Sequence, residues 1–219
     1  VSAVLSIPDI AEQKHLVMVT KNGNIKKTAI EEFKNLRANG LIAIKLRDED
    51  ILEWVRPSTG ADDVILVTAQ GQSIRFAEKS VRPMGRAAAG VRGIKLKKKG
   101  DRVIGMDIVD PEMVKKNMLE LFVIAENGMG KRTNLKEYKL QGRGGSGIKT
   151  MHISAKTGEA VGAYVSASSD ERDLIVVSKN GQVIRLPFGS VSKLGRDTQG
   201  VRLMRFKEQS DVVATVTFI

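Results

Sequence analysis

The stretch that decides the fold is "LFVIAENGMGKRT", residues 121–133. It places an apolar run before Asn127-Gly128 and a basic pair, Lys131-Arg132, after it. Asn-Gly between strand-like segments is the strongest short-range signal for a β-hairpin, because both positions tolerate a positive φ. Residues 121–133 therefore predict two antiparallel strands joined by a tight turn.

The same pattern occurs three more times in the 219 residues. Each copy has an apolar run, a turn that ends in glycine, and a basic residue four places beyond that glycine. The other copies are "LVMVTKNGNIKKT" from Leu16, "VILVTAQGQSIRF" from Val64 and "LIVVSKNGQVIRL" from Leu174. The anchor glycines, Gly23, Gly71, Gly128 and Gly181, are separated by 48, 57 and 53 residues. Repeats of this length, built from short strands and glycine turns, indicate a propeller-like array.

A second motif, which we call the Gly-Arg turn, follows each hairpin. It consists of Gly-Arg, three variable residues, a second glycine and an aliphatic residue: "GRAAAGV" at Gly85, "GRGGSGI" at Gly142 and "GRDTQGV" at Gly195. The first repeat has a shortened form, "NLRANGL", with Arg37 and Gly40. Apolar residues follow at regular places, and a basic or titratable residue precedes the last of them: Lys45, Lys95, His152 and Arg205.

Gly142, Gly144 and Gly147 also match G-x-G-x-x-G, the pattern of dinucleotide-binding loops. Such a loop leads into a helix whose N-terminus binds the pyrophosphate, but residues 148–153 show no helical pattern. A P-loop would require lysine where Ile148 stands. The other Gly-Arg turns keep only the outer glycines, which argues against a nucleotide site.

We therefore predict an all-β chain that forms one propeller-like domain over residues 1–219. Short helices are expected only at 28–33 and 111–119. The first residue is Val1 rather than methionine, which indicates a fragment of a longer protein. The four repeats lie at 16–58, 64–110, 121–166 and 174–219.

Charge points to a polyanionic partner. Lys and Arg number 36 against 25 Asp and Glu, a net charge of +11. The repeats carry +2, +6, +4 and +4, whereas the remaining stretches together carry −5. The positive charge thus belongs to the repeated unit, and a radial array would place it in a continuous stripe. No signal peptide and no apolar run long enough to cross a bilayer is visible.

Among nucleic acids, duplex DNA fits best. Aromatic residues make up only 4% of the chain, too few for the base stacking that single-strand binders use. No recognition helix is apparent, so contact with the duplex backbone remains. The predicted DNA-binding residues are Lys27, Arg37, Lys45, Arg75, Arg86, Arg92, Lys95, Lys131, Arg132, Arg143, Lys149, Arg185, Arg196, Arg202 and Arg205.

Catalytic chemistry is not indicated. His15 and His152, the only histidines, occupy unrelated repeat positions, and cysteine is absent, so no metal site is predicted. Tyr138 and Tyr164 fit apolar positions of their repeats and have no neighbouring acids or arginines that would indicate a strand-cleaving nucleophile. We expect no catalytic residue and no cofactor.

With these residues in hand, the chain resembles the C-terminal domain of the A subunit of bacterial DNA gyrase. The resemblance rests on "KNG" followed by "KKT", on "MGRAAAGVRGIKL" and on "GMGKRTNLKEYKLQGRGGSGIKT", and it runs over essentially the whole length. It implies a β-pinwheel of about four blades, each a four-stranded antiparallel unit that exchanges strands with its neighbours. Val1–Ile7 would be such an exchanged strand.

The resemblance also implies a function: wrapping duplex DNA around a basic rim in support of negative supercoiling, without catalytic activity of its own. Implied partners are the catalytic part of the same gyrase A subunit together with the ATPase B subunit, in the bacterial cytoplasm at the nucleoid.

Two departures from the family pattern stand out. The family heptapeptide reads Gln-Arg-Arg-Gly-Gly-Lys-Gly, whereas Gln141–Gly147 has Gly142 in place of the first arginine and Ser146 in place of the lysine. The family usually has six blades, so the signature blade is expected upstream of Val1. The alternatives are the related domain in the A subunit of topoisomerase IV and, from another class, a propeller scaffold that binds protein.

Overall fold

The computed structural model describes residues 13–34, 40–208 and 210–219, and these residues form four antiparallel sheets. The predicted strand at Val1–Ile7 lies outside the described residues, as does Arg37. The strands of the first two repeats are β1 (His15–Thr20), β2 (Asn24–Ala29), β3 (Leu52–Ser58), β4 (Asp63–Thr68), β5 (Gln72–Ala77), β6 (Val91–Arg92) and β7 (Val103–Val109). Those of the last two are β8 (Leu119–Ala125), β9 (Met129–Asn134), β10 (Ile148–Lys149), β11 (Ala160–Ala167), β12 (Asp173–Ser178), β13 (Val183–Pro187), β14 (Val201–Arg202) and β15 (Val213–Phe218).

Helical segments in the described part of the chain are short. One α-helix, α2 (Pro111–Lys115), connects the second repeat to the third, and it begins at Asp110, whose side chain accepts a hydrogen bond from the Glu112 N–H. A single 3-10 turn follows each hairpin: η1 (Ile30–Phe33), η2 (Glu78–Ser80), η3 (Leu135–Glu137) and η4 (Phe188–Ser190). The all-β prediction is confirmed.

Every repeat begins with the predicted hairpin: β1–β2, β4–β5, β8–β9 and β12–β13. The geometry of the turn differs from the expectation that Asn and Gly would both take a positive φ. Gly23 has φ +80°, but Asn22, Asn127 and Asn180 are not among the residues with a positive φ. The Gly23 N–H donates to the Thr20 carbonyl at 2.9 Å, which makes a four-residue turn that ends in a left-handed glycine.

Strand exchange is confirmed in three sheets, whose orders are β3-β1-β2-β6, β10-β5-β4-β7 and β11-β8-β9-β14. In each of them the short outer strand comes from the following repeat, just after its Gly-Arg turn. The fourth sheet has three strands, β13-β12-β15, rather than the expected four. Among the described residues, no strand pairs with the free side of β13, the place that an exchanged strand takes in the other three sheets.

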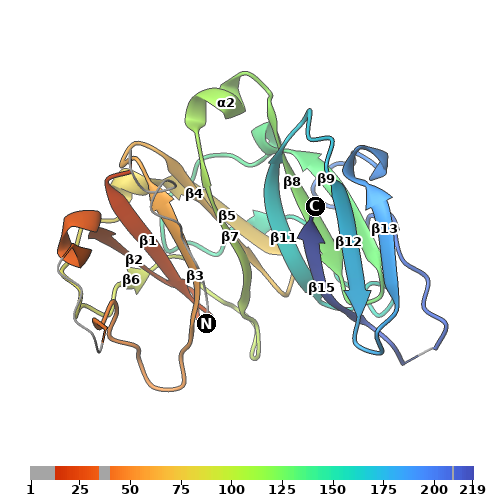
Figure 1. Cartoon of the computed structure of the whole chain (residues 1–219), viewed down its shortest axis with the longest axis horizontal. Helices are drawn as coiled ribbons and strands as arrows, with labels where there is room; N and C mark the ends of the chain where they lie inside the picture. The colour runs from red at the N-terminus through yellow and green to blue at the C-terminus, as the bar shows by residue number, and fades with distance from the viewer. Residues whose placement is uncertain (1–12, 35–39, 209) are drawn as a thin grey trace.

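The sheets stack face to face, so each core lies between two consecutive repeats. In β4, Val64 and Leu66 pack into one core while Ile65 and Val67 pack into the next. β8 is divided in the same way between the second and third cores. Figure 1 shows the first sheet at one end of the molecule and the fourth at the other. This stacking explains why the central strands read as unbroken apolar runs instead of alternating.

The two edges of each sheet are different. The last strands of successive repeats contact one another, β3 with β7, β7 with β11 and β11 with β15. The exchanged strands β6, β10 and β14 lie at the opposite edge, which we call the outer edge. The Gly-Arg turns therefore gather at the outer edge.

Candidate nucleic-acid interface

The second glycine of each Gly-Arg turn allows the exchanged strand to approach its neighbour. Gly147 has φ +72°, and a Cβ built on it would lie 2.3 Å from the Ser73 carbonyl oxygen. Gly90 and Gly200 have the same conformation and meet the carbonyls of Ile25 and Gly130. The first glycine is different, because a Cβ on Gly142 would meet nothing within 4 Å. The strand exchange thus requires the second glycine but not the first.

Backbone hydrogen bonds join each Gly-Arg turn to the repeat before it. The Lys95 N–H donates to the Gly145 carbonyl at 2.8 Å, and the His152 N–H donates to the Thr198 carbonyl at 3.0 Å. The Lys45 N–H makes the same contact with the Ala88 carbonyl at 3.2 Å. The residues that occupy one repeat position in the sequence are therefore consecutive along the outer edge.

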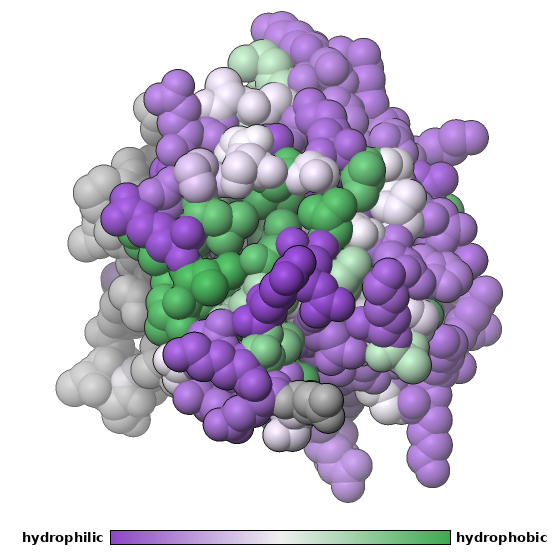
Figure 2. Space-filling view, turned by 90° about the vertical axis from the view of Figure 1, so that its right-hand side faces the viewer, coloured by the Kyte–Doolittle hydropathy of each residue, from purple (hydrophilic) through white to green (hydrophobic). Residues whose placement is uncertain are grey.

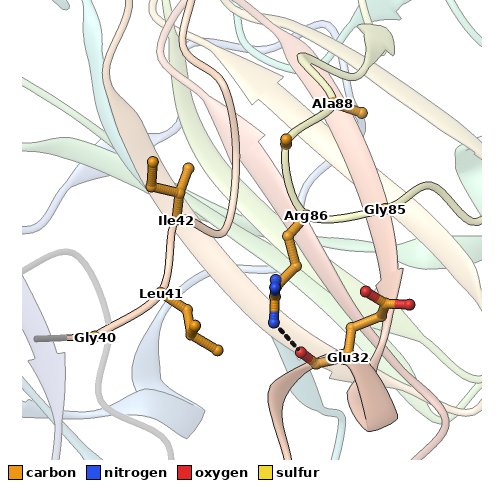
Figure 3. A pocket seen from close by; sticks show the side chains of 8 residues that line it. Glu32, Gly40, Leu41, Ile42, Gly85, Arg86 and Ala88 are labelled. Atoms are coloured by element: carbon orange, nitrogen blue, oxygen red, sulfur yellow. Dashed lines mark hydrogen bonds between the residues drawn. The ribbon is translucent and has the colours of Figure 1, made fainter. Parts of the chain in front are cut away.

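The arginines of the three described Gly-Arg turns are half-buried and donate to backbone carbonyls. Arg86 Nη1 lies 2.6 Å from the Glu32 carbonyl oxygen, and Figure 3 shows this contact beside an open pocket that Leu41 and Ile42 also line. Arg143 Nη1 lies 2.5 Å from the Arg92 carbonyl, and Arg196 Nη1 lies 2.9 Å from the Lys149 carbonyl. These arginines fasten a turn to the preceding repeat, a role that the sequence did not reveal.

Six of the predicted DNA-binding residues are exposed at or next to the exchanged strands and Gly-Arg turns, and we call them the basic rim. Three of them stand two places after the second glycine, and three occupy the position before the last apolar residue: Arg92, Lys149, Arg202, Lys45, Lys95 and Arg205. His152 is exposed at the corresponding place in the third repeat. Asp197 partly offsets this charge, since its carboxylate lies 3.4 Å from Lys149 Nζ.

The basic residues that follow each hairpin glycine by four places form internal ion pairs instead. Arg75 pairs with Asp63 at 2.7 Å and also donates to the Tyr138 carbonyl of the next repeat. Arg132 lies 3.2 Å from Glu120, which is fully buried. Lys27 Nζ lies 3.2 Å from Glu78. The side chains of Lys27, Arg75 and Arg132 are at most 11% exposed, so we leave these residues out of the proposed contact set.

The same position in the last repeat differs. Arg185 pairs with Asp173 at 2.6 Å, but its side chain is 66% exposed. Among the described residues its strand, β13, lies at an edge of its sheet, and Val183 on it is 57% exposed. The side of the molecule that carries the fourth sheet shows an apolar area bordered by hydrophilic residues (Figure 2).

Lys131 is the deepest of the predicted residues. Its side chain is fully buried, and its Nζ donates to the carbonyls of Gly195 and Arg196 at 2.5 Å each and to Thr198 Oγ1 at 3.0 Å. Burial lowers the pKa of Lys131 to about 8, although the carboxylates of Glu137 and Asp197 act in the opposite direction. Lys131 therefore cannot contact a ligand directly in this conformation.

The structure adds three lysines that the sequence argument missed. Lys97, Lys98 and Lys99 are exposed in the loop after β6. Lys95, Lys97 and Lys98 line a small pocket together with Ser146 of the third Gly-Arg turn. The loop thus brings lysines to the place where the family heptapeptide carries its own. A run of three lysines was the available signal, but it lies outside the repeated positions.

The described residues offer no visible catalytic centre. Tyr138 is 1% exposed, its hydroxyl lies 2.7 Å from Thr150 Oγ1, and burial raises its pKa to about 12. The Tyr164 hydroxyl donates to the Val216 carbonyl at 3.2 Å. No group of three or more His, Cys, Asp or Glu side chains suited to a metal ion occurs in the described part of the chain. The same part contains no helix with the length and apolar character needed to cross a membrane.

Comparisons with known proteins agree with this geometry. A family model described as the DNA gyrase C-terminal domain, a β-propeller, matches residues 14–59, 62–110, 119–167 and 172–219. The DNA gyrase A subunit of Staphylococcus epidermidis (strain ATCC 12228) is 41% identical over 217 residues, which cover 99% of this chain and 23% of that protein. The corresponding gyrase subunit of Staphylococcus aureus (strain MRSA252) is 39% identical over 213 residues, covering 97% and 23%. The chain thus spans about a quarter of the length of these relatives.

Two solved structures share the fold. A DNA gyrase A C-terminal domain superposes with a TM-score of 0.79 and 29% identity, covering 96% of this chain and 67% of that one. The C-terminal domain of DNA topoisomerase IV superposes with a TM-score of 0.86 at 24% identity, covering 98% and 64%. The second likeness concerns the fold alone, whereas the sequence relatives above are gyrase subunits.

Proposed function

Because the chain belongs to the DNA gyrase C-terminal domain family, we propose that it binds duplex DNA along its basic rim and bends the duplex around the outer edge. The observation that carries this proposal is the chain of backbone hydrogen bonds from repeat to repeat at Lys45, Lys95 and His152. Equivalent exposed side chains, of which Lys45 and Lys95 are lysines, thus follow one another along one edge, an arrangement suited to a long, curved polyanion.

The chemistry of the basic rim favours phosphate over base contacts. Its members are lysines and arginines on short exchanged strands, and no described helix is long enough to enter a major groove. Such contacts position a duplex but carry no sequence information. Binding is therefore largely independent of sequence. Bending a duplex by 40–90° costs on the order of 1–6 kcal/mol, so several repeats must contact it together.

In the whole protein, we propose that this domain works with the catalytic part of the same A subunit together with the ATPase B subunit of a gyrase, in the bacterial cytoplasm at the nucleoid. Wrapping by the domain would present DNA to the catalytic part with one handedness, which supports negative supercoiling. The domain itself carries out no strand cleavage, since Tyr138 is buried, Tyr164 is half-buried and both hydroxyls are hydrogen-bonded.

The experiment that tests binding is a salt titration of the purified chain with two short duplexes of unrelated sequence. If the six residues of the basic rim neutralise about six phosphates, affinity falls roughly a thousandfold between 50 and 200 mM salt. Fluorescence anisotropy measures it. Affinity that is flat with salt would favour the protein-binding scaffold, and a strong preference for one duplex would contradict backbone recognition.

A further inference from the structure

Two positions outside the basic rim alternate along the chain. Three residues after the hairpin glycine, the successive repeats carry Lys26, Ile74, Lys131 and Ile184. Nine residues after it they carry Glu32, Ser80, Glu137 and Ser190. A lysine is thus always accompanied by a glutamate, and an isoleucine by a serine. The repeats therefore fall into two kinds that take turns.

In the first kind of repeat, the lysine donates hydrogen bonds to the Gly-Arg turn of the next repeat. An ammonium group has three hydrogens, and Lys131 Nζ directs them at three acceptors, the carbonyls of Gly195 and Arg196 and the Thr198 hydroxyl. Lys26 Nζ contacts the Ala43 carbonyl at 2.6 Å and the Arg86 carbonyl in the corresponding way. Both lysines are fully buried.

This anchoring orients the peptide groups of the fourth Gly-Arg turn. In a trans peptide the C=O and the N–H point in opposite directions. Since the carbonyls of Gly195 and Arg196 point at Lys131, the N–H groups that follow them point away from it. The first of these, Arg196 N–H, lies 3.3 Å from a carboxylate oxygen of the exposed Glu137. A backbone N–H beside an arginine is where a phosphate oxygen binds well, and here a carboxylate occupies that place.

The third Gly-Arg turn is held differently. Ile74 Cδ1 lies 3.7 Å from the position of a Cβ on Gly145, and Arg143 contacts the backbone carbonyl of Ser80, so this turn rests on an apolar side chain and a neutral residue. Within the described part of the chain, no carboxylate forms a hydrogen bond or an ion pair with residues 142–147. The Gly144 N–H donates to the Gly93 carbonyl at 2.8 Å. The Arg143 N–H corresponds to that of Arg196 and has no carboxylate partner among the described residues.

We propose that Lys131 and Glu137 form a clamp that positions the fourth Gly-Arg turn and blocks its phosphate site, so that Glu137 must be displaced before DNA can bind there. The third turn is open and takes a phosphate directly. Along the outer edge, the open third turn then lies next to the clamped fourth turn, and a duplex engages the open turn first. This inference rests on the proposed function, because it concerns phosphates of the same duplex.

The first test removes only the competing charge. In Glu137→Gln the carboxylate becomes a neutral amide of the same size, and short-duplex affinity should rise about fivefold, the effect of one charge about 4 Å from a phosphate in water. The slope of log affinity against log salt should steepen by about 0.9, the contribution of one more phosphate. Glu171→Gln is the control, since Glu171 is exposed and forms no contact with a Gly-Arg turn. Equal effects of the two variants would overturn the clamp.

The second test exchanges the two kinds of repeat. Lys131→Ile/Glu137→Ser imports the pair found in the second repeat and should tighten binding as Glu137→Gln does. Ile74→Lys/Ser80→Glu introduces a lysine and a glutamate at the corresponding positions next to the third Gly-Arg turn, and it should weaken duplex binding by a similar factor. Thermal unfolding verifies that each variant is folded. The proposal is contradicted if a folded variant changes duplex affinity in the direction opposite to the one expected for it, or leaves it unchanged. If one of the two variants does not fold, the result for Glu137→Gln decides.

The role of Lys131 has its own readout. Above about pH 8 its amine becomes neutral and has two hydrogens for three acceptors. The charged side chains of Glu137, Asp197 and Arg196 face this group. Raising the pH through this window should therefore weaken duplex binding by the wild type but not by Lys131→Ile/Glu137→Ser. If duplex affinity changes with pH in the same way in the wild type and in Lys131→Ile/Glu137→Ser, Lys131 only packs against the turn and its proposed role is wrong. If the wild type and Glu171→Gln show no salt-dependent binding at all, the proposed function fails rather than the clamp.

Discussion

At the scale of single residues, one ion pair recurs with different surroundings. The base that follows the hairpin glycine by four places meets an acid at the start of the same hairpin in the last three repeats: Arg75 with Asp63, Arg132 with Glu120, and Arg185 with Asp173. In the first repeat His15 takes the acid position, and Lys27 pairs with Glu78 of the second repeat. A single sequence pattern thus produces one exposed pair and three buried ones.

This contrast gives a matched prediction. Arg75→Met leaves the Asp63 carboxylate, only 5% exposed, without its partner, so the free energy of unfolding should fall by about 3 kcal/mol. Arg185→Met breaks the same pair where the arginine is 66% exposed, and the loss should stay within about 1 kcal/mol. Urea unfolding measures both. Equal losses would show that the burial of the Asp63 pair has no bearing on its contribution.

A second prediction at this scale concerns pH. The pKa of Lys131 is about 8 in the folded chain against an ordinary 10.5, so between these values the unfolded chain binds more protons than the folded one. The free energy of unfolding contributed by this group therefore rises with pH across that window, by on the order of 3 kcal/mol. Urea unfolding at about pH 7.5 and about pH 10 should show this rise in the wild type and its loss in Lys131→Ile/Glu137→Ser. An undiminished rise in the variant would assign it to other groups.

At the scale of elements, the sequence predicts the hairpins and the repeats, whereas strand exchange is implied only by the resemblance to the gyrase family. The apolar runs and glycine turns are local signals, and local signals suffice for strands that pair with their sequence neighbours. The sequence does not separate exposed from buried basic side chains, because Lys131, Arg132 and Lys149 are all simply positive charges in the sequence pattern. Only the stacking of one repeat on the next covers the former and leaves the latter in solvent.

The exchanged strand is the element most sensitive to substitution. Gly147→Ala places a Cβ in the left-handed region and against the Ser73 carbonyl, so it should destabilise by roughly 1–2 kcal/mol for the conformation alone, and by more because of the clash. Gly142→Ala is the matched control within the same turn and should change stability by about 0.5 kcal/mol or less, since its Cβ meets open space. Thermal unfolding distinguishes them. A tolerated Gly147→Ala would mean that β10 does not need this close approach.

At the scale of the whole molecule, the arrangement of the basic rim predicts that removing some of its cations reduces the bend of a bound duplex more than the affinity for DNA. Arg92→Ala/Lys149→Ala removes adjacent cations from the second and third repeats and should reduce the bend of a long duplex more than the affinity for a short one. A short duplex can still bind at the remaining repeats, whereas a bend needs consecutive contacts. Energy transfer between the ends of a labelled duplex measures the bend.

The control for that experiment is Lys115→Ala/Lys116→Ala, which removes the same charge from the end of α2, away from the exchanged strands. Both doubles lose two positive charges, so a general weakening of the electrostatic attraction is common to them. A bend that decreases equally in the two variants would mean that the path of the duplex does not follow the basic rim.

Strand exchange also delays the completion of each sheet during synthesis on the ribosome. The strands that complete the sheets of β2, β5 and β9 are β6, β10 and β14, which belong to the next repeat. About 60–70 further residues must therefore be synthesised before each of these sheets can be completed. At 5–20 residues per second, each nascent sheet presents an unpaired edge for roughly 3–14 seconds. An exposed edge is a template for pairing with another chain, so neighbouring nascent chains on one message face a recurring risk of exchanging strands with each other.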